Sequence, residues 1–373
     1  MSIAAGTQPA LAQAPNPPAD TTSNAKQVVD ISGTHFTLDG TVWLPKGLQI
    51  RGFIAPAAFE RKDDKGVDLN ARKNYGPLEL AAATNFGADE LRFQVSQPSF
   101  DSKSPLYDAH YVSITEDAIA TARKAGFVVI ISMQDEPRSG EPKQHPLPTA
   151  ATERDWMELN AKFGKDRGVM FELYNEPSLK ESIDNWNTWA YGGKLPDEDE
   201  PSIGMQTLID DLRTAGCLNV IILDGLRSAA TLLGVPSTIT DPFQRVAYAV
   251  HPYQFGSSNE SKWDQQFGIE SQSVPVIVTE WSAQTDSYIG LRNLPDYHVA
   301  VDLLNYLSSH SIPLSAGALD IPNFMSQSVP GWIPTNYDSY SPLQHNRNAG
   351  LLVQKLFMNN YAVTLTMADG VTH

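Results

Sequence analysis

The alternation of apolar and polar residues predicts short strands that take turns with helices. Apolar runs of strand length lie at residues 47–54, 90–95, 127–134, 169–174, 219–223, 246–250, 274–279 and 314–319. Segments with helical spacing lie between and after them, at residues 77–85, 109–126, 152–163, 203–215, 260–267, 297–308 and 346–360. Strands that alternate with helices form parallel sheets, and eight such units over roughly 300 residues favour a closed barrel over an open sheet. We therefore predict an α/β fold, a (β/α)8 TIM barrel.

A β-hairpin pattern precedes the first barrel strand. Residues 28–44 alternate between apolar and polar, and Asp39-Gly40 separates two apolar runs, which is a strong signal for a two-residue turn. We expect this hairpin to cover the bottom of the barrel. Residues 1–26 are rich in Ala, Pro, Thr, Ser and Gln, which predicts disorder. The predicted organisation is a tail over residues 1–27 and a single barrel domain over residues 28–373.

Polar residues stand at the ends of nearly all predicted strands. Residues 169–177 read VMFELYNEP, so an apolar run stops at Asn175-Glu176, and Pro177 cannot continue a central ladder. The run at 274–279 is likewise followed by Glu280. Polar side chains at one end of parallel strands are costly in a core but line the cleft of a barrel. The other strand-end residues are Arg92, Gln94, Gln134, Asp135, His251, Tyr253, Trp281 and Asp320.

Glu176 and Glu280 are the candidate reactive groups. They are 104 residues apart, which fits three βα units of about 31 residues each and places them on the fourth and seventh strands. Two carboxyl groups at such strand ends are the minimum that acid/base or nucleophilic catalysis of the cleavage of a sugar acetal requires. The alternative, two unrelated ion-pair partners, requires both strand ends to coincide by chance. No Gly-x-Gly-x-x-Gly or P-loop follows the first strand, which disfavours nucleotide binding.

Composition narrows the range of partners. The chain has 43 acidic and 27 basic residues and a formal charge of −16, which argues against nucleic acid and anionic membranes because both are bound by basic patches. The single cysteine, Cys217, excludes an internal disulfide and a cysteine-based zinc site, and we expect it to be a buried core residue. No apolar run approaches the roughly 20 residues of a membrane span. We expect a monomer with no metal and no cofactor.

The N-terminal tail contains a second, weaker pattern. Residues 9–14 read PALAQA, which resembles a signal-peptidase site with cleavage after Ala12. No hydrophobic segment precedes it, so we interpret it as the remnant of a trimmed signal sequence and expect a secreted or periplasmic protein. The alternative is a plain flexible tail.

The strand-end motifs resemble those of the glycoside hydrolases of clan A, and most closely family 5, the cellulase family. The resemblance rests on Asn-Glu-Pro at 175–177, His-Pro-Tyr at 251–253, Thr-Glu-Trp at 279–281 and Leu-Arg-Phe at 91–93, and it extends over residues 28–362. It implies a retaining double displacement in which Glu176 is the general acid/base and Glu280 the nucleophile. The two carboxyl groups would then lie about 5–5.5 Å apart.

The resemblance also implies supporting roles. Arg92 would hold Glu280 ionised, Tyr253 would donate its hydroxyl to Glu280, and His251 would tune Glu176. Asn175 would bind the sugar 2-hydroxyl, and Trp281 would stack on a sugar face. For Arg92, His251 and Tyr253 a purely structural role is the alternative, and for Trp281 the alternative is packing in the core.

Two positions depart from the family pattern and bear on the substrate. Gln134 stands where the third strand usually ends in histidine, and Asp320 stands where the eighth often ends in a tryptophan that floors the −1 sugar. Trp332, in the loop beyond, is the candidate to replace that tryptophan from another direction. A glutamine can still hydrogen-bond a sugar but cannot carry charge.

The leading hypothesis is therefore a retaining β-glycosidase that acts on a β-linked glucan, mannan or related polysaccharide. The competing hypotheses are a non-catalytic glycan-binding barrel and a transglycosylase with the same carboxylates. The sugar, the linkage and the choice between internal and terminal attack are left open by the sequence.

Overall fold

Eight parallel strands form a closed barrel in the computed structural model, which describes residues 27–54, 75–141, 143–253, 259–282, 297–320, 327–329, 333–336 and 349–370. Each strand pairs with its successor in the chain, and the last pairs with the first. The strands are β4 (Lys46–Ile50), β5 (Glu90–Ser96), β6 (Val128–Gln134), β7 (Val169–Glu172), β8 (Val220–Asp224), β9 (Val246–Val250), β10 (Val276–Trp281) and β11 (Leu314–Ala316). The predicted barrel is confirmed.

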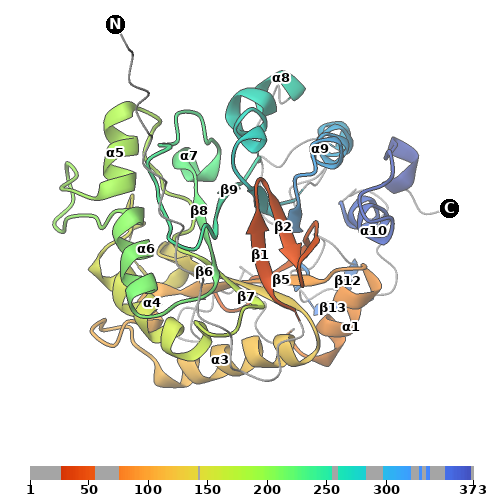
Figure 1. Cartoon of the computed structure of the whole chain (residues 1–373). Coiled ribbons are helices and arrows are strands. Elements are labelled where there is room, and N and C mark those ends of the chain that lie inside the picture. Colours follow the sequence, from red (N-terminus) through yellow and green to blue (C-terminus); the bar gives the residue numbers. More distant parts are fainter. Residues whose placement is uncertain are drawn as a thin grey trace, which may run out of the picture.

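Helices surround the barrel (Figure 1). They are α1 (Pro77–Asn85), α2 (Gln97–Phe100), α3 (Ala109–Lys124), α4 (Ala150–Phe163), α5 (Ile183–Tyr191), α6 (Met205–Thr214), α7 (Leu226–Ala229), α8 (Glu260–Trp263), α9 (Tyr297–Ser309) and α10 (Gly350–Met358). Local sequence sets their ends. Asp108 caps α3 by accepting the N–H groups of His110 and Tyr111, and Arg123 and Lys124 complement the dipole of its last turn.

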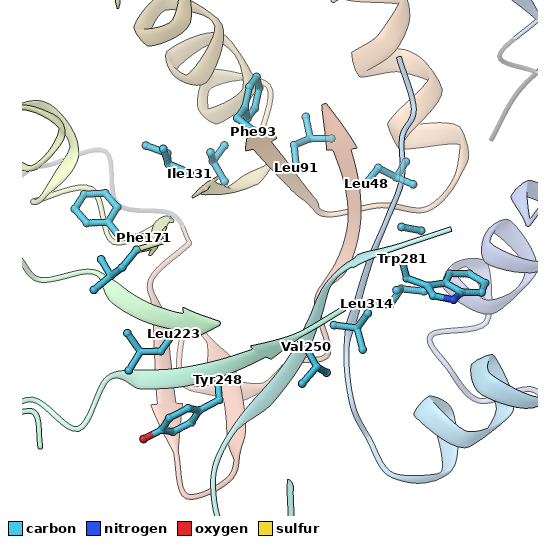
Figure 2. Close-up of a cluster of buried hydrophobic side chains, with 14 of the residues drawn as sticks. Leu48, Leu91, Phe93, Ile131, Phe171, Leu223, Tyr248, Val250, Trp281 and Leu314 are labelled. Carbon is cyan, nitrogen blue, oxygen red and sulfur yellow. The ribbon is translucent and has the colours of Figure 1, made fainter. Parts of the chain in front are cut away.

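The hydrophobic residues form two layers because strand side chains alternate between the barrel interior and its outer face. The outer layer packs against the helices, and Figure 2 shows part of it: Leu48, Leu91, Phe93, Ile131, Phe171, Leu223, Tyr248, Val250, Trp281 and Leu314. The inner layer fills the barrel with Val128, Ile130, Met170, Val220, Ile222, Ala247, Ala249 and Ile277. Strands buried on both faces explain the nearly continuous apolar runs in the sequence.

The predicted hairpin is a small antiparallel sheet of β1 (Val29–Ser32), β2 (His35–Leu38) and β3 (Thr41–Val42). Val29 and Phe36 pack on the inner layer of the barrel. Asp30 forms ion pairs with Arg167 at 2.5 Å and with Arg245 at 2.9 Å, and these arginines precede β7 and β9. The sheet therefore covers the N-terminal end of the barrel, and the carboxyl ends of the strands are left for a site.

Some predicted boundaries shift in the structure. The fourth and eighth strands end at Glu172 and Ala316, earlier than predicted, and the last helix begins at Gly350. A second small sheet pairs β12 (Gln327–Val329) with β13 (Ile333–Asn336). Cys217 is fully buried, as predicted.

The structure does not test three of the predictions: the disordered tail, the role of Trp332 and the division of the chain into a tail and one domain. The N-terminal tail over residues 1–26 and Trp332 lie outside the described residues. The division into a tail and one domain stays a prediction. Within the described residues, no helix combines the length and the apolar character that crossing a membrane requires.

Candidate active site

A layer of polar side chains lies on top of the apolar barrel interior, toward the carboxyl ends of the strands. In four strands the polar residue comes two positions after an apolar interior residue: Met170 to Glu172, Ile222 to Asp224, Ala249 to His251, and Ile277 to Thr279. Because strand side chains alternate between faces, all four polar residues point inward. The barrel thus gathers acids, a histidine and a hydroxyl in one buried layer.

Glu280 joins this layer through an irregularity in β10. The register of β10 against β11 shifts between Val278 and Trp281, where β10 carries one residue more than its neighbour. A bulge of this kind re-aims a side chain. As a result, the adjacent residues Thr279 and Glu280 both reach the site, and Trp281 returns to the outer face.

Arg92 connects most of the site. Its side chain is fully buried, and its Nε and Nη2 donate to the two carboxylate oxygens of Glu172, each at 2.7 Å. Its Nη1 donates to Glu280 Oε2 at 2.9 Å. Its Nη2 also donates to Asn175 Oδ1 at 2.9 Å and to Ser132 Oγ at 2.8 Å. This fork of charge-assisted bonds fixes both glutamates and the asparagine relative to one guanidinium.

Glu280 is held as a carboxylate. Beyond the bond from Arg92, its Oε2 accepts a hydrogen bond from Gln94 Nε2 at 2.6 Å, and its Oε1 accepts one from the Tyr253 hydroxyl at 3.2 Å. Burial alone would raise the pKa of Glu280, but the charges of Arg92, His251 and Arg51 outweigh it and lower the pKa to about 2. Glu280 is therefore ionised at neutral pH.

The Tyr253 hydroxyl stays protonated. Burial, and then the negative charge of Glu280, raise the pKa of Tyr253 well above its ordinary value. A protonated phenol can donate its hydrogen to the carboxylate of Glu280.

Glu176 has different surroundings. It follows β7 with a φ of 55°, a left-handed conformation that is uncommon for residues other than glycine. Its main-chain N–H donates to Asp224 Oδ2 at 2.9 Å, and its Oε1 lies 3.0 Å from His251 Nδ1. The side chain is 25% exposed, against 8% for Glu280. One carboxyl group is thus open to solvent and paired with a histidine, and the other is enclosed by an arginine.

A hydrogen-bond chain sets the orientation of His251. Glu172 is a carboxylate that Arg92 holds ionised, so it only accepts, and the Thr279 hydroxyl donates to its Oε1 at 3.2 Å. That hydroxyl then accepts from His251 Nε2 at 2.9 Å. Nε2 therefore carries a hydrogen, and Nδ1 is left to share a hydrogen with Glu176.

The pKa of His251 is displaced by its acidic neighbours. Burial alone would lower it, but the carboxyl groups of Asp224, Glu176 and Glu280 raise it to about 9. His251 is thus protonated at neutral pH, and its Nδ1 hydrogen points to Glu176.

A cavity of about 730 Å³ opens beside Glu176. Glu176, His251 and Tyr253 line one part of it, and the rest is mostly polar, with Arg227 and Lys262 among the lining residues. Its volume is typical of ligand sites. Glu176 therefore faces a space that can hold a small polar molecule or part of a polymer.

The structure brings most of the predicted site residues together. Arg92, Asn175, Glu176, His251, Tyr253 and Glu280 are joined by the contacts given above. Gln134 lies beside them, fully buried, and its Nε2 donates to Ser132 Oγ at 2.9 Å. A substrate contact for Gln134 and for Asn175 stays a prediction.

Two predicted site residues are corrected by the structure. Trp281 is fully buried on the outer side of the strands, near Leu314 (Figure 2), so it packs in the core and offers no face to a sugar. Asp320 is also fully buried, and its carboxyl accepts the main-chain N–H groups of Arg51 at 3.0 Å and Gly52 at 2.7 Å. Asp320 therefore secures the segment that follows β4 instead of facing a substrate.

Three residues of the site were missed as functional candidates, namely Glu172, Asp224 and Thr279, and Gln94 was predicted at a strand end without a role. The signal that locates the first three is the two-residue period itself. Counting two positions on from an apolar interior residue leads to each of them, although a polar residue inside an apolar run reads as an interruption of the strand.

Glu172, Asp224 and His251 form a compact buried group whose potential ligand atoms all lie within 4.8 Å of one another. Arg92 already bonds both oxygens of Glu172, and Thr279 bonds one of them. The guanidinium thus supplies the positive charge that a cation would otherwise bring, and the donor set fits a hydrogen-bonded cluster better than a metal site.

A parallel eight-stranded barrel with a pair of glutamates at its carboxyl end is typical of one class of protein, the TIM-barrel glycoside hydrolases. A sequence model described as cellulase, glycosyl hydrolase family 5, matches residues 79–316. The chain belongs to glycosyl hydrolase family 5, which confirms the resemblance seen in the motifs.

Solved structures share this fold at low sequence identity. An endocellulase from Pyrococcus horikoshii is 14% identical with a TM-score of 0.62, over 89% of this chain and 99% of that one. The catalytic domain of an endoglucanase from Thermobifida fusca is 16% identical with a TM-score of 0.59, over 90% and 97%. The catalytic domain of a mannanase from Streptomyces sp. SirexAA-E is 14% identical with a TM-score of 0.55, over 88% and 92%. No curated protein sequence matches the chain significantly.

Proposed function

We propose that the protein is a retaining β-glycosidase that cleaves a β-linked glucan or mannan by double displacement. Glu280 is the nucleophile, and Glu176 is the general acid and then the general base. The observation that carries the proposal is the difference between the two carboxyl groups: Arg92, Gln94 and Tyr253 hold Glu280 as a carboxylate, whereas Glu176 shares a hydrogen with His251 at the edge of a cavity.

In the first step, Glu280 attacks the anomeric carbon and forms a glycosyl ester, while Glu176 delivers a proton to the departing oxygen. The hydrogen bonds from the Tyr253 hydroxyl and Arg92 to Glu280 weaken as the ester forms and the negative charge of Glu280 falls. They stabilise the carboxylate again when the ester breaks. In the second step, Glu176 takes a proton from water, which attacks the same carbon and releases the sugar with its original configuration.

The proposed substrate class is supported by family membership and by the neighbouring structures, which are named as endocellulases and a mannanase. A neutral polysaccharide also suits a chain of net charge −16. Gln134 and the inward-turned Asp320 stand where the family often places histidine and tryptophan, so we expect the −1 sugar to be held mainly by Asn175 and other hydrogen-bonding groups.

Azide rescue tests the two roles separately. Glu280→Ala and Glu176→Ala should each lose at least about a thousandfold in kcat on the polysaccharide, in the range of enzymatic groups that act only in the transition state. With an activated aryl β-glycoside, azide should give the α-glycosyl azide from Glu280→Ala and the β-glycosyl azide from Glu176→Ala.

Glu158→Gln, an exposed glutamate on α4, is the matched control and should keep full activity. The assignment is wrong if either alanine variant hydrolyses the polysaccharide normally, or if the two azide products are exchanged. Saturable binding of the polysaccharide without new reducing ends would favour a binding barrel, and sugar transfer to an added acceptor would favour transglycosylation.

We also propose that the protein is exported. The support is the PALAQA segment at residues 9–14, and the test is cell fractionation with N-terminal sequencing of the mature protein. Recovery of the protein in the cytoplasm with Met1 in place would contradict it.

A further inference from the structure

Asp224 is a buried carboxyl group at the end of β8 for which the proposed reaction has no direct use. It is fully buried, and its main-chain oxygen accepts a hydrogen bond from Trp189 Nε1 at 3.0 Å, which fixes its place. Its Oδ2 accepts the N–H of Glu176 at 2.9 Å and lies 3.7 Å from His251 Nε2. Its Oδ1 is buried and accepts no hydrogen bond from any donor in the described part of the chain.

A proton on Asp224 accounts for the lone Oδ1. Glu172 lies in the same compact group, with a carboxyl oxygen within 4.8 Å of one of Asp224. Two buried carboxylates at this distance repel each other strongly, so one of the two carries a proton. Arg92 bonds both oxygens of Glu172 and holds it ionised. The proton therefore belongs to Asp224, which donates it toward Glu172.

The charges of the cluster agree with this assignment. The guanidinium of Arg92 already bonds two buried carboxylates, Glu172 and Glu280. An ionised Asp224 would add a third buried negative charge, and His251 Nε2, 3.7 Å from its Oδ2, is beyond hydrogen-bond distance, so this charge would be costly. Burial, and then the charge of Glu172, raise the pKa of Asp224 well above its ordinary range, in the same direction.

We propose that Asp224 is a positioning residue for the proton donor, a neutral carboxyl that donates to Glu172 and accepts the Glu176 N–H. Asp224 thereby connects Glu172, which Arg92 fixes in place, to the main chain of Glu176. The proposal rests on the assignment of Glu176 as the general acid/base.

The geometry of Glu176 explains why such a tie is needed. Its φ of 55° costs on the order of 1 kcal/mol or more for a residue with a Cβ, so the conformation requires support. The bond from its N–H to Asp224 supplies that support directly, and the neighbouring Asn175 N–H is bonded to Met133 O at 2.9 Å. Without Asp224, the Glu176 carboxyl is free to turn away from His251 and from the scissile oxygen.

Infrared difference spectroscopy tests the protonation state without any assay of activity. The spectrum of the wild type minus that of Asp224→Asn at pH 7 should contain the C=O band of a protonated carboxyl group. The same subtraction with Asp101→Asn is the control and should contain carboxylate bands only, since Asp101 is a buried acid that forms an ion pair with Arg154. Carboxylate bands in the Asp224 difference spectrum would overturn the proposal, and they are what a bound cation at this cluster would require.

Kinetics test the positioning role. Asp224→Asn keeps one donor and one acceptor in place and should keep at least about a third of kcat, whereas Asp224→Ala should lose roughly 10–100-fold in kcat, the equivalent of one or two charged hydrogen bonds, with KM changed little. Asp224→Leu, of similar volume, replaces the alanine variant if the latter does not fold.

The leaving group separates positioning of the acid from general damage. A 2,4-dinitrophenyl β-glycoside needs no proton to depart, so the alanine variant should form the glycosyl-enzyme at nearly the wild-type rate on it, by pre-steady-state burst, and be slow on the polysaccharide. Equal losses on both substrates would show a structural role only and overturn the proposal. A wild type inactive on every β-glycoside would instead refute the proposed function, while the infrared result would still stand.

Discussion

In the proposed reaction, Glu176 and Glu280 differ in chemistry only because their surroundings differ. Glu280 meets a guanidinium, an amide and a phenol, all of which donate to it. Glu176 meets a histidine and a cavity. Opposite environments that separate the pKa values of two acids are the general means by which one site supplies an acid and a nucleophile.

Arg92→Lys should lower kcat/KM by about 10–100-fold, because a lysine cannot bond Glu172 and Glu280 together and loses charge-assisted bonds of about 1.5–3 kcal/mol. Glu280 must be ionised to react, so activity falls as pH drops through its pKa. The wild-type pKa of about 2 should rise in the variant, and the acid limb of the kcat/KM profile should move to higher pH. An unmoved acid limb in a folded variant would show that Arg92 does not control Glu280.

The buried carboxyl group of Glu90 should make the free energy of unfolding decrease as the pH rises. Burial raises the pKa of Glu90 to about 8, so the folded protein holds this proton more tightly than the unfolded chain does. The contribution of Glu90 to the free energy of unfolding is complete at a pH below the pKa that Glu90 has in the unfolded chain. It is lost as the pH rises toward 8, at about 1.4 kcal/mol per pKa unit. Urea unfolding at pH 5 and pH 8 should show a smaller drop for Glu90→Gln than for the wild type, and equal drops would contradict this.

At the scale of elements, the two ends of the barrel have separate tasks. The β1–β3 sheet covers the N-terminal end through Val29 and Phe36, and the residues of the candidate active site lie at the carboxyl end. Long βα connections at the carboxyl end vary function in this architecture, while the other end serves stability. Mutations at the two ends should therefore have different effects.

Asp30→Ala removes the ion pairs to Arg167 and Arg245 and should lower the free energy of unfolding by about 1–3 kcal/mol. Its kcat/KM, measured well below the midpoint of thermal unfolding, should equal that of the wild type. Asp117→Ala, exposed on α3, is the control and should leave both quantities unchanged. A loss of activity in Asp30→Ala without a loss of stability would contradict the separation of tasks.

Elements were predictable where local sequence determines them. The strand Val128–Gln134 is buried on both faces and reads as one apolar run, and α1 begins at Pro77, which suits a first helical turn. The bulge in β10 was not predictable, because it depends on the register against β11, and so Trp281 was expected at the site. Asp224 and Glu172 were missed because their meaning comes from neighbours on other strands.

At the scale of the whole molecule, the net negative charge agrees with the proposed neutral substrate. With a net charge of −16, the protein repels anions at long range, and salt screens such fields over about 10 Å at 0.1 M. A neutral polysaccharide feels neither effect.

The KM for the preferred polysaccharide should therefore change less than about twofold between low salt and about 0.5 M NaCl. The initial rates of reducing-end release give this measurement. A steep dependence on salt would indicate a charged substrate and would redirect the search for the glycan.

Trapping of the intermediate tests the central claim most directly. A 2-deoxy-2-fluoro β-glycoside of the sugar that the enzyme hydrolyses, with a good leaving group, slows the release of the glycosyl ester and lets it accumulate. Peptide mapping by mass spectrometry should then find one fluoro-sugar per protein, attached to Glu280. Attachment to another residue, or turnover of the natural substrate with inversion of configuration, would contradict the account.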